Sequence, residues 1–136
     1  MLRIFAVSFL LLSAQIGATQ DLTNQRIRVS VAALDATTFE VMDGIDTGPR
    51  QMWCAAALFA KRKYGVNSGQ IWLERGLGPS STMPRRRSVV FSLKPVPNEY
   101  KSISLSIRRS GQVVGISLAD SLCRNSDFRV RIREVG

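Results

Sequence analysis

The sequence contains no histidine, few acidic residues and only two cysteines among its 136 residues. The missing histidine excludes Ser-His-Asp and Cys-His catalysis, and it removes the commonest zinc ligand and the side chain that titrates near neutral pH. Among the ten aspartates and glutamates, no two stand out as the paired carboxylates of a glycosidase. We therefore predict no catalytic residue, no metal site and no cofactor.

Long apolar runs are also scarce, and the one that stands out lies at the start of the chain. After Arg3, residues 4–12 are almost wholly apolar and are followed by small residues. This run is much shorter than the roughly 20 residues that span a bilayer as a helix, and its place after a positive start is typical of a secretory signal peptide. An uncleaved anchoring helix, the alternative, usually needs a longer apolar run. No transmembrane segment is expected.

We assign residues 1–18 to the signal peptide, with cleavage after Ala18 or, as the alternative, after Ala14. Residues 19–136 then form a mature chain whose length suits a single domain. We expect this domain to be exported, to the periplasm or out of the cell.

Cys54 and Cys123 remain as an even pair in a compartment where thiols are oxidised. In a small exported domain, such a pair is the usual signature of a disulfide. The alternative is a reactive thiolate at Cys54, because this residue lies in the first turns of a predicted helix and helix N-termini lower thiol pKa values. Since a thiolate nucleophile needs a base and the chain has no histidine, we favour a structural disulfide.

The formal net charge of +9 is high for a chain of this length. A basic surface attracts anionic partners. For an exported protein, these would be an anionic envelope component such as lipid or polysaccharide, or an acidic protein. Nucleic acid is disfavoured as a partner, because the compartment normally lacks it.

One helix is predicted at residues 49–64. Pro49 suits the first helical turn, where its missing N–H costs nothing, and Gly65 stands where a left-handed cap would follow. Apolar side chains surround the helix axis over residues 52–60, which indicates burial on all sides. The basic residues at 61–63 complement the dipole at its C-terminus.

Alternating apolar and polar residues predict strands elsewhere in the mature chain, with the first two joined closely enough for a hairpin. Arginines take most of the polar positions in the first and last of these strands, and serines take them in the fifth. This order of elements favours an α+β domain with a small antiparallel sheet of about five to seven strands, one main buried helix on its inner face and one disulfide. The predicted strands are 26–31, 37–42, 70–75, 88–93, 102–108, 112–118 and 128–134.

The segment between the strands predicted at 70–75 and 88–93 is the most suggestive of function. It combines glycines, hydroxyl groups and several arginines. Backbone amides freed by glycine, hydroxyl donors and guanidinium groups together favour an anion such as phosphate or carboxylate, although the lysine and helix of a P-loop are missing. A long exposed hairpin loop kept in solution by its arginines is the alternative. The candidate binding residues are Arg75, Ser80, Ser81, Arg85, Arg86 and Arg87.

Trp72 is a further candidate for binding. It alternates with Ile71 and Leu73, so it lies on the opposite strand face if those two residues point to the core. An exposed tryptophan beside arginines would be a contact anchor. Coverage by the termini or by Tyr100 is the alternative.

Glu40, Asp43 and Asp46 come closest to an acidic cluster. Their spacing could place carboxylates around calcium, but the ligand density of a calcium loop is missing. We therefore interpret them as part of a solvated turn.

Four segments of the chain resemble a group of small, uncharacterised exported proteins of alphaproteobacteria. The most specific segment is Trp-Cys-Ala-Ala-Ala at residues 53–57, and the others are residues 39–41, 75–80 and 121–123. The resemblance implies export and a paired late cysteine. It implies no activity, ligand or catalytic residue.

Three functional hypotheses follow. The leading one is a non-enzymatic exported binding or accessory domain whose basic surface engages an anionic envelope component or a protein partner. The second is a small hydrolase or transferase that uses carboxylates or a serine with a lysine, for which Ser80 or Ser81 with Lys94 are the first candidates. The third is a subunit that only stabilises a larger envelope complex.

Overall fold

The computed structural model describes residues 25–125 and 128–136, so the predicted signal peptide lies outside the described residues. The described residues fold as six strands and two helices, which confirms the α+β class. Neither helix in this part of the chain is long and apolar enough to cross a membrane. The elements are β1 (Gln25–Ala33), β2 (Thr38–Met42), α1 (Pro49–Tyr64), β3 (Gln70–Pro79), β4 (Arg87–Ser92), β5 (Val113–Gly115), α2 (Ile116–Ser121) and β6 (Phe128–Glu134).

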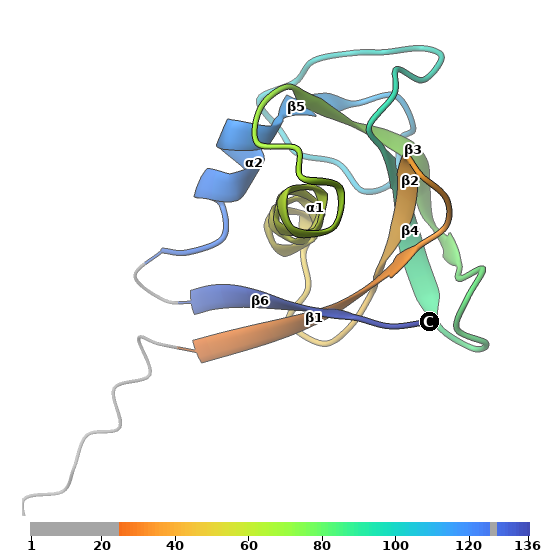
Figure 1. Cartoon of the computed structure of the whole chain (residues 1–136), viewed down its shortest axis with the longest axis vertical. Coiled ribbons are helices and arrows are strands. Elements are labelled where there is room, and N and C mark those ends of the chain that lie inside the picture. Colours follow the sequence, from red (N-terminus) through yellow and green to blue (C-terminus); the bar gives the residue numbers. More distant parts are fainter. Residues whose placement is uncertain (1–24, 126–127) are drawn as a thin grey trace, which may run out of the picture.

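The six strands form one sheet in the order β5-β3-β4-β2-β1-β6, and this sheet curls around α1 (Figure 1). Helix α2 lies at the open side of the curl and packs against α1 (Figure 1). All neighbouring strands are antiparallel except β1 and β6, which are parallel. The predicted antiparallel sheet therefore contains one parallel pair. Most of the chain separates these two strands, so no tight turn forces them to run in opposite directions.

Helix α1 begins and ends where the sequence signals predict. Gly48 precedes Pro49, and its N–H donates to Gln51 Oε1 at 2.9 Å. The helix ends at Tyr64 and is capped by Gly65, whose φ of 67° is in the left-handed region. Eight of its residues are buried, which makes α1 the centre of the core: Met52, Trp53, Cys54, Ala55, Ala56, Ala57, Phe59 and Ala60.

Aromatic rings connect α1 to the middle of the sheet. Phe39 of β2 lies with its ring centroid 5.0 Å from that of Phe59, and Phe91 of β4 lies 4.9 Å from Trp53. The indole N–H of Trp53 donates to the backbone oxygen of Ser106 at 2.9 Å. The helix is thus tied both to the sheet and to the long segment that follows β4.

That segment contains the clearest error in the sequence prediction, because residues 102–108 form no strand. Their serines bond to nearby backbone groups instead: Ser102 Oγ accepts from the N–H of Ser104 at 3.1 Å. The buried Gln112 side chain accepts from the N–H of Ser106 at 2.7 Å and donates to the oxygen of Ser104 at 3.0 Å. These side chains bind backbone groups that a neighbouring strand would otherwise bind.

The strand predicted at 112–118 is also mostly wrong. Only Val113–Gly115 form β5, and the chain then enters α2. Ile116 and Ala119 are the buried residues of α2, and their spacing of three matches a helix face. The apolar alternation after Gly115 therefore belongs to a short helix packed on α1.

Strand β3 extends beyond its predicted end and passes through the glycine-rich segment to Pro79. Its pairing with β4 is irregular on both sides of Arg75. Gly76 is required by a close backbone approach, because a Cβ atom there would lie 2.2 Å from the oxygen of Arg108. The neighbouring N–H of Leu77 donates to the oxygen of Ile107 at 2.7 Å.

Candidate functional site

The hydroxyl-rich loop between β3 and β4 holds an anion, and that anion is the side chain of Glu40. Glu40 lies on β2 and is fully buried. Its Oε1 accepts hydrogen bonds from Ser80 Oγ at 2.6 Å, from the N–H of Thr82 at 3.0 Å and from the Thr82 hydroxyl. Its Oε2 accepts from the N–H of Ser81 at 3.0 Å and from Ser88 Oγ at 2.7 Å. Donors predicted to bind an external anion therefore bind an internal one.

These donors keep Glu40 ionised inside the protein. Burial alone would raise the pKa of this carboxyl group. The hydrogen bonds from Ser80, Thr82, Ser88 and the backbone of Ser81 outweigh burial and lower the pKa to about 2. The ionised carboxylate in turn holds the loop against the outer face of β2 and β4.

Arg75 completes this cluster from β3. Its Nη2 lies 4.0 Å from Glu40 Oε2 and donates to Ser88 Oγ at 2.7 Å. Its Nη1 donates to the backbone oxygen of Gly76 at 2.9 Å. The guanidinium group of this predicted binding residue therefore stabilises the loop through internal contacts.

The cluster does not favour a serine-based enzyme. Ser80 donates to Glu40, whereas Lys94 is bonded through its backbone to Ser92. Within the described part of the chain, no hydrogen bond joins Lys94 to Ser80 or Ser81. A carboxylate that has a pKa of about 2 and already accepts hydrogen bonds from four residues is a weak general base at neutral pH.

Glu40 does not share a solvated turn with Asp43 and Asp46, contrary to the prediction. The loop that follows β3 covers the face of β2 that carries Glu40, and it removes the Glu40 side chain from water. Asp46 is exposed, and Asp43 Oδ1 accepts from the N–H of Gly44 at 3.0 Å, so these two residues do belong to a surface turn. Across residues 25–125 and 128–136, no three His, Cys, Asp or Glu residues cluster closely enough to hold a metal ion.

The three consecutive arginines of the loop, Arg85, Arg86 and Arg87, are all exposed. Arg86 Nη2 donates to the backbone oxygen of Asp43 at 2.9 Å, so it ties the loop to the turn after β2. Arg85 and Arg87 leave their side chains at the surface. These two residues stay candidates for contact with an anion.

Trp72 is only 8% exposed, so it is covered and does not form a surface anchor in this structure. It lies on β3 between Ser92 of β4 and Val113 of β5. Its indole Nε1 is buried and has no hydrogen-bond partner among the described residues.

Five arginines that the sequence analysis did not select come together on the outer face of β1 and β6. The parallel register places Arg26 beside Arg129 and Arg28 beside Arg131, and Arg133 continues the row on β6. All five are exposed, while Ile27, between Arg26 and Arg28, and Val130, between Arg129 and Arg131, are buried. We call this set the arginine ladder: Arg26, Arg28, Arg129, Arg131 and Arg133.

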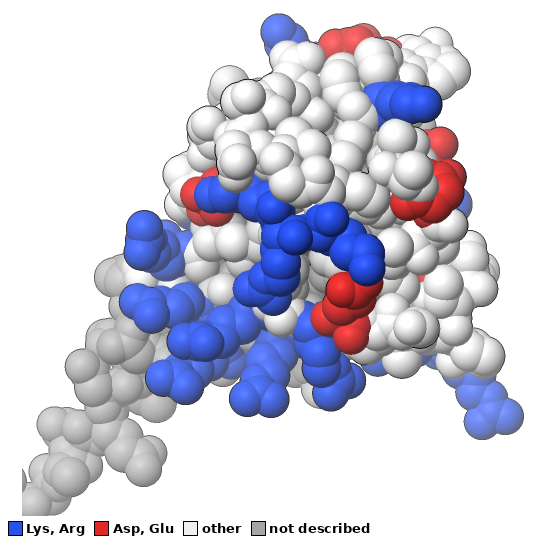
Figure 2. All heavy atoms as spheres, in the orientation of Figure 1, with Lys and Arg blue, Asp and Glu red and all other residues white. Residues whose placement is uncertain are grey.

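Figure 2 shows basic side chains gathered along the lower side of the molecule, where Figure 1 places β1 and β6. Alternate residues on a strand are about 6.6 Å apart and neighbouring strands about 4.8 Å apart. The ladder therefore presents two short rows of guanidinium groups. A hollow of about 230 Å³ lies among them, lined by Arg28, Arg131, Ile132 and Arg133.

Within the described residues, no carboxylate lies within ion-pair distance of the arginine ladder. Other basic side chains among the described residues do form ion pairs with carboxylates. Lys61 lies 3.4 Å from Asp120, and Lys63 lies 2.7 Å from Glu134. The basic end of α1 is thus partly neutralised from within the fold, whereas the ladder is not.

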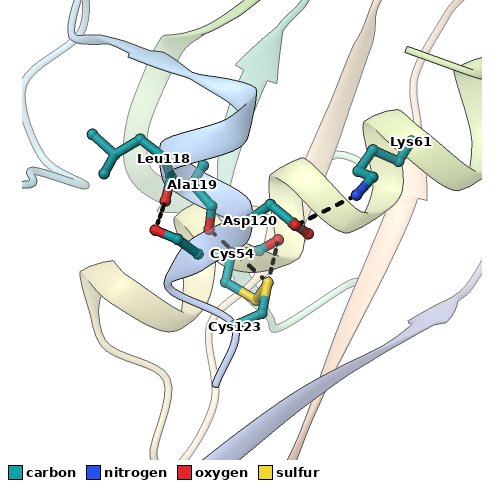
Figure 3. Close-up of a disulfide and its surroundings, with 7 residues drawn as sticks. Cys54, Lys61, Leu118, Ala119, Asp120 and Cys123 are labelled. Atoms are coloured by element: carbon teal, nitrogen blue, oxygen red, sulfur yellow. Dashed lines mark hydrogen bonds and ion pairs between the residues drawn. A yellow bond between two sulfur atoms is a disulfide. The ribbon is translucent and has the colours of Figure 1, made fainter. Parts of the chain in front are cut away.

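The Cys54–Cys123 disulfide is present, which confirms this prediction (Figure 3). It joins α1 to the segment between α2 and β6, and the ion pair of Lys61 with Asp120 lies nearby (Figure 3). The oxygen of Cys123 accepts from the N–H of Val130 at 2.8 Å. The disulfide therefore fixes the start of β6 and with it one row of the arginine ladder.

Comparisons of the chain with protein-family models, curated proteins and solved structures found no significant match. The resemblance to small exported alphaproteobacterial proteins therefore stays a prediction. Its most specific segment, residues 53–57, lies in the buried part of α1 and includes one cysteine of the disulfide.

Proposed function

We propose that this chain is an exported, non-enzymatic binding or accessory domain that engages an anionic envelope component or an acidic protein through the arginine ladder. The observation that carries this proposal is the set of five exposed arginines on one face of β1 and β6, with no carboxylate partner among the described residues. The net charge of +9 supports it, because long-range attraction would bring anions to this surface.

The chemistry of the ladder suits oxyanions. Guanidinium groups stay protonated at all physiological pH values, and each can donate two parallel hydrogen bonds to a phosphate or carboxylate. Two neighbouring groups on adjacent strands could bind the same oxyanion or successive groups of a polymer. The ligand class is therefore anionic and multivalent.

The arginine ladder destabilises the sheet through charge repulsion, which a bound anion would relieve. Like charges placed directly opposite each other on neighbouring strands destabilise a sheet, and Arg26 with Arg129 and Arg28 with Arg131 are two such pairs. Arginines on β6 alone could serve to prevent other strands from adding to this sheet edge. Arg26 and Arg28 lie on β1, an inner strand, so edge protection does not account for them.

The test compares two triple variants with equal loss of charge. One removes ladder charges (Arg26→Gln, Arg28→Gln and Arg131→Gln), and the control removes exposed charges elsewhere (Arg50→Gln, Arg62→Gln and Arg108→Gln). Immobilised protein is incubated with envelope fractions at low and high salt, and the retained lipid, polysaccharide and protein are quantified. A retained protein assembly would identify the chain as an accessory subunit.

We expect salt-sensitive retention, because exposed charge pairs are screened at high ionic strength. With about 0.5 kcal/mol for each lost contact, the ladder variant should bind roughly tenfold more weakly than the wild type. The control variant should lose little of this binding. Equal losses in both variants would show that net charge, and not the ladder, determines binding, and retention of nothing at low salt would contradict the proposal.

A further inference from the structure

A second site, separate from the arginine ladder, lies at the opposite edge of the sheet. It is an apolar pocket of about 360 Å³ between β5, α2 and the segment that contains residues 101–105. This volume is at the small end of the range of about 300 to 1,000 Å³ that is usual for small-molecule sites. The pocket is lined by Gln70, Lys101, Ser102, Ile103, Leu105, Val113, Val114, Gly115, Leu118 and Leu122.

The lining of the pocket is mainly apolar from its buried part to its exposed part. Val113 and Val114 are 4% and 5% exposed, so they belong to the interior. Ile103 is fully exposed and Leu118 is 60% exposed, which extends the apolar surface outward. Ile103 and Leu118 line the same pocket, and apolar side chains grouped in one place, unlike single exposed ones, are a usual mark of a binding surface.

Lys101 is the one charged residue that lines the pocket, and its side chain is exposed. No carboxylate lines the pocket. An occupant with an aliphatic body and a single negative head therefore matches both parts of the lining, whereas a cationic head would be repelled.

A peptide strand added to the edge of β5 fits less well. The N–H of Val113 already donates to the backbone oxygen of Tyr100 at 3.0 Å. In addition, β5 is only three residues long, Val113–Gly115. An added strand would need free donors along the edge.

We propose that this pocket binds the chain of a single-chain fatty acid, with the carboxylate of the ligand beside Lys101. The small volume suits one aliphatic chain, and the exposed Leu118 and Ile103 would cover the part of the chain nearest the head group. This inference does not depend on the arginine ladder, and it gives the domain an amphiphile-binding site distinct from its basic face.

The experiment uses three probes that share one chain length: decanoate, decanol and decyltrimethylammonium, each below its micelle concentration. Binding to the purified protein is measured by isothermal titration calorimetry. Leu118→Asp places a charge in the pocket, and Ile45→Asp is the matched control, because Ile45 is 92% exposed and does not line the pocket. Lys101→Gln removes the single positive charge.

We expect decanoate to bind more tightly than decyltrimethylammonium. Lys101→Gln should weaken decanoate binding by about two- to fivefold, the effect of one exposed charge pair, and should leave decanol unchanged. Leu118→Asp should abolish binding of decanoate and decanol, while Ile45→Asp should bind both like the wild type. Circular dichroism spectra confirm that each variant is folded.

Two results would overturn the inference. Unchanged decanoate binding in Leu118→Asp would show that the ligand binds elsewhere, for example on the arginines, and equal affinity for the anionic and cationic probes would remove the role of Lys101. The triple ladder variant separates this site from the proposed function, because it should lose retention of envelope components but keep decanoate binding in the pocket.

Discussion

Replacing Glu40 with glutamine tests whether the buried carboxylate is an internal ligand of the loop between β3 and β4. Glutamine keeps the shape of the side chain but removes its charge. It also places an NH₂ group where donors from Ser80, Ser81, Thr82 and Ser88 now converge, so some of them would face another donor. We expect a loss of stability at neutral pH and a more mobile loop.

The magnitude follows from the pKa. The carboxyl group has a pKa of about 2 in the folded protein and an ordinary value of 4.5. Each pKa unit corresponds to about 1.4 kcal/mol, so ionised Glu40 contributes about 3 kcal/mol to the free energy of unfolding near pH 7. This is a large part of a typical net stability of about 5 to 15 kcal/mol.

The same pKa difference predicts a pH dependence with a definite sign. The folded-state pKa of Glu40 is lowered, so the unfolded state takes up the proton first as the pH falls. The contribution is fully present above about pH 4.5 and is lost between about pH 4.5 and pH 2, with roughly 2 kcal/mol gone by pH 3. The Glu40→Gln variant should lack this component.

Urea denaturation of the wild type and Glu40→Gln at pH 7 and pH 3 measures both effects. Asp46→Asn serves as the control, because Asp46 is exposed and asparagine tolerates its positive φ of 65°. The control should stay within about 0.5 kcal/mol of the wild type. The reasoning is refuted if Glu40→Gln costs less than about 1 kcal/mol at pH 7, or if its difference from the wild type is the same at both pH values.

Two further predictions concern covalent and steric constraints. Cys54→Ser and Cys123→Ser should each lower the free energy of unfolding by a similar amount, about 4 kcal/mol on the chain-entropy estimate for a bond that joins residues 69 positions apart. Non-reducing peptide mapping should find the linked pair, and a rapidly alkylated Cys54 whose replacement leaves folding intact would contradict the structural role. Gly76→Ala should cost about 1 to 3 kcal/mol, because the new Cβ would lie 2.2 Å from the oxygen of Arg108. Thermal unfolding beside Gly44→Ala, whose Cβ would meet only Thr47 at 3.7 Å, measures this cost, and equal melting temperatures would disprove the close approach.

Local signals were sufficient for the elements whose ends and faces depend on nearby residues. Helix α1 has the predicted bounds because Pro49 and Gly65 act through their own backbone conformations. Strands β1, β2, β4 and β6 lie within one or two residues of their predicted positions, because alternation of apolar and polar side chains is a property of each strand alone. The oxidised pair Cys54–Cys123 followed from the cysteine count and the expected export.

Alternation was misleading where the backbone found partners other than a neighbouring strand. Residues 102–108 alternate serine with aliphatic residues, yet the side chain of Gln112 and the serines themselves bind their backbone groups. Trp72 and Glu40 stand at polar-face positions of their strands, but other parts of the chain cover that face. Which face is covered depends on segments far away in the sequence, and a short pattern does not contain that information.

The candidate sites also depended on the tertiary structure. The alternating arginines of β1 and β6 are visible in the sequence, but only the parallel pairing of these distant strands brings Arg26 beside Arg129 and joins the two rows into one surface. The loop chemistry was visible too, and the hydroxyl and amide donors of Ser80 and Ser81 do bind a carboxylate. The sequence alone determined that the chain is basic and contains anion-binding groups, whereas the fold decided which of these groups are satisfied internally and which face solvent.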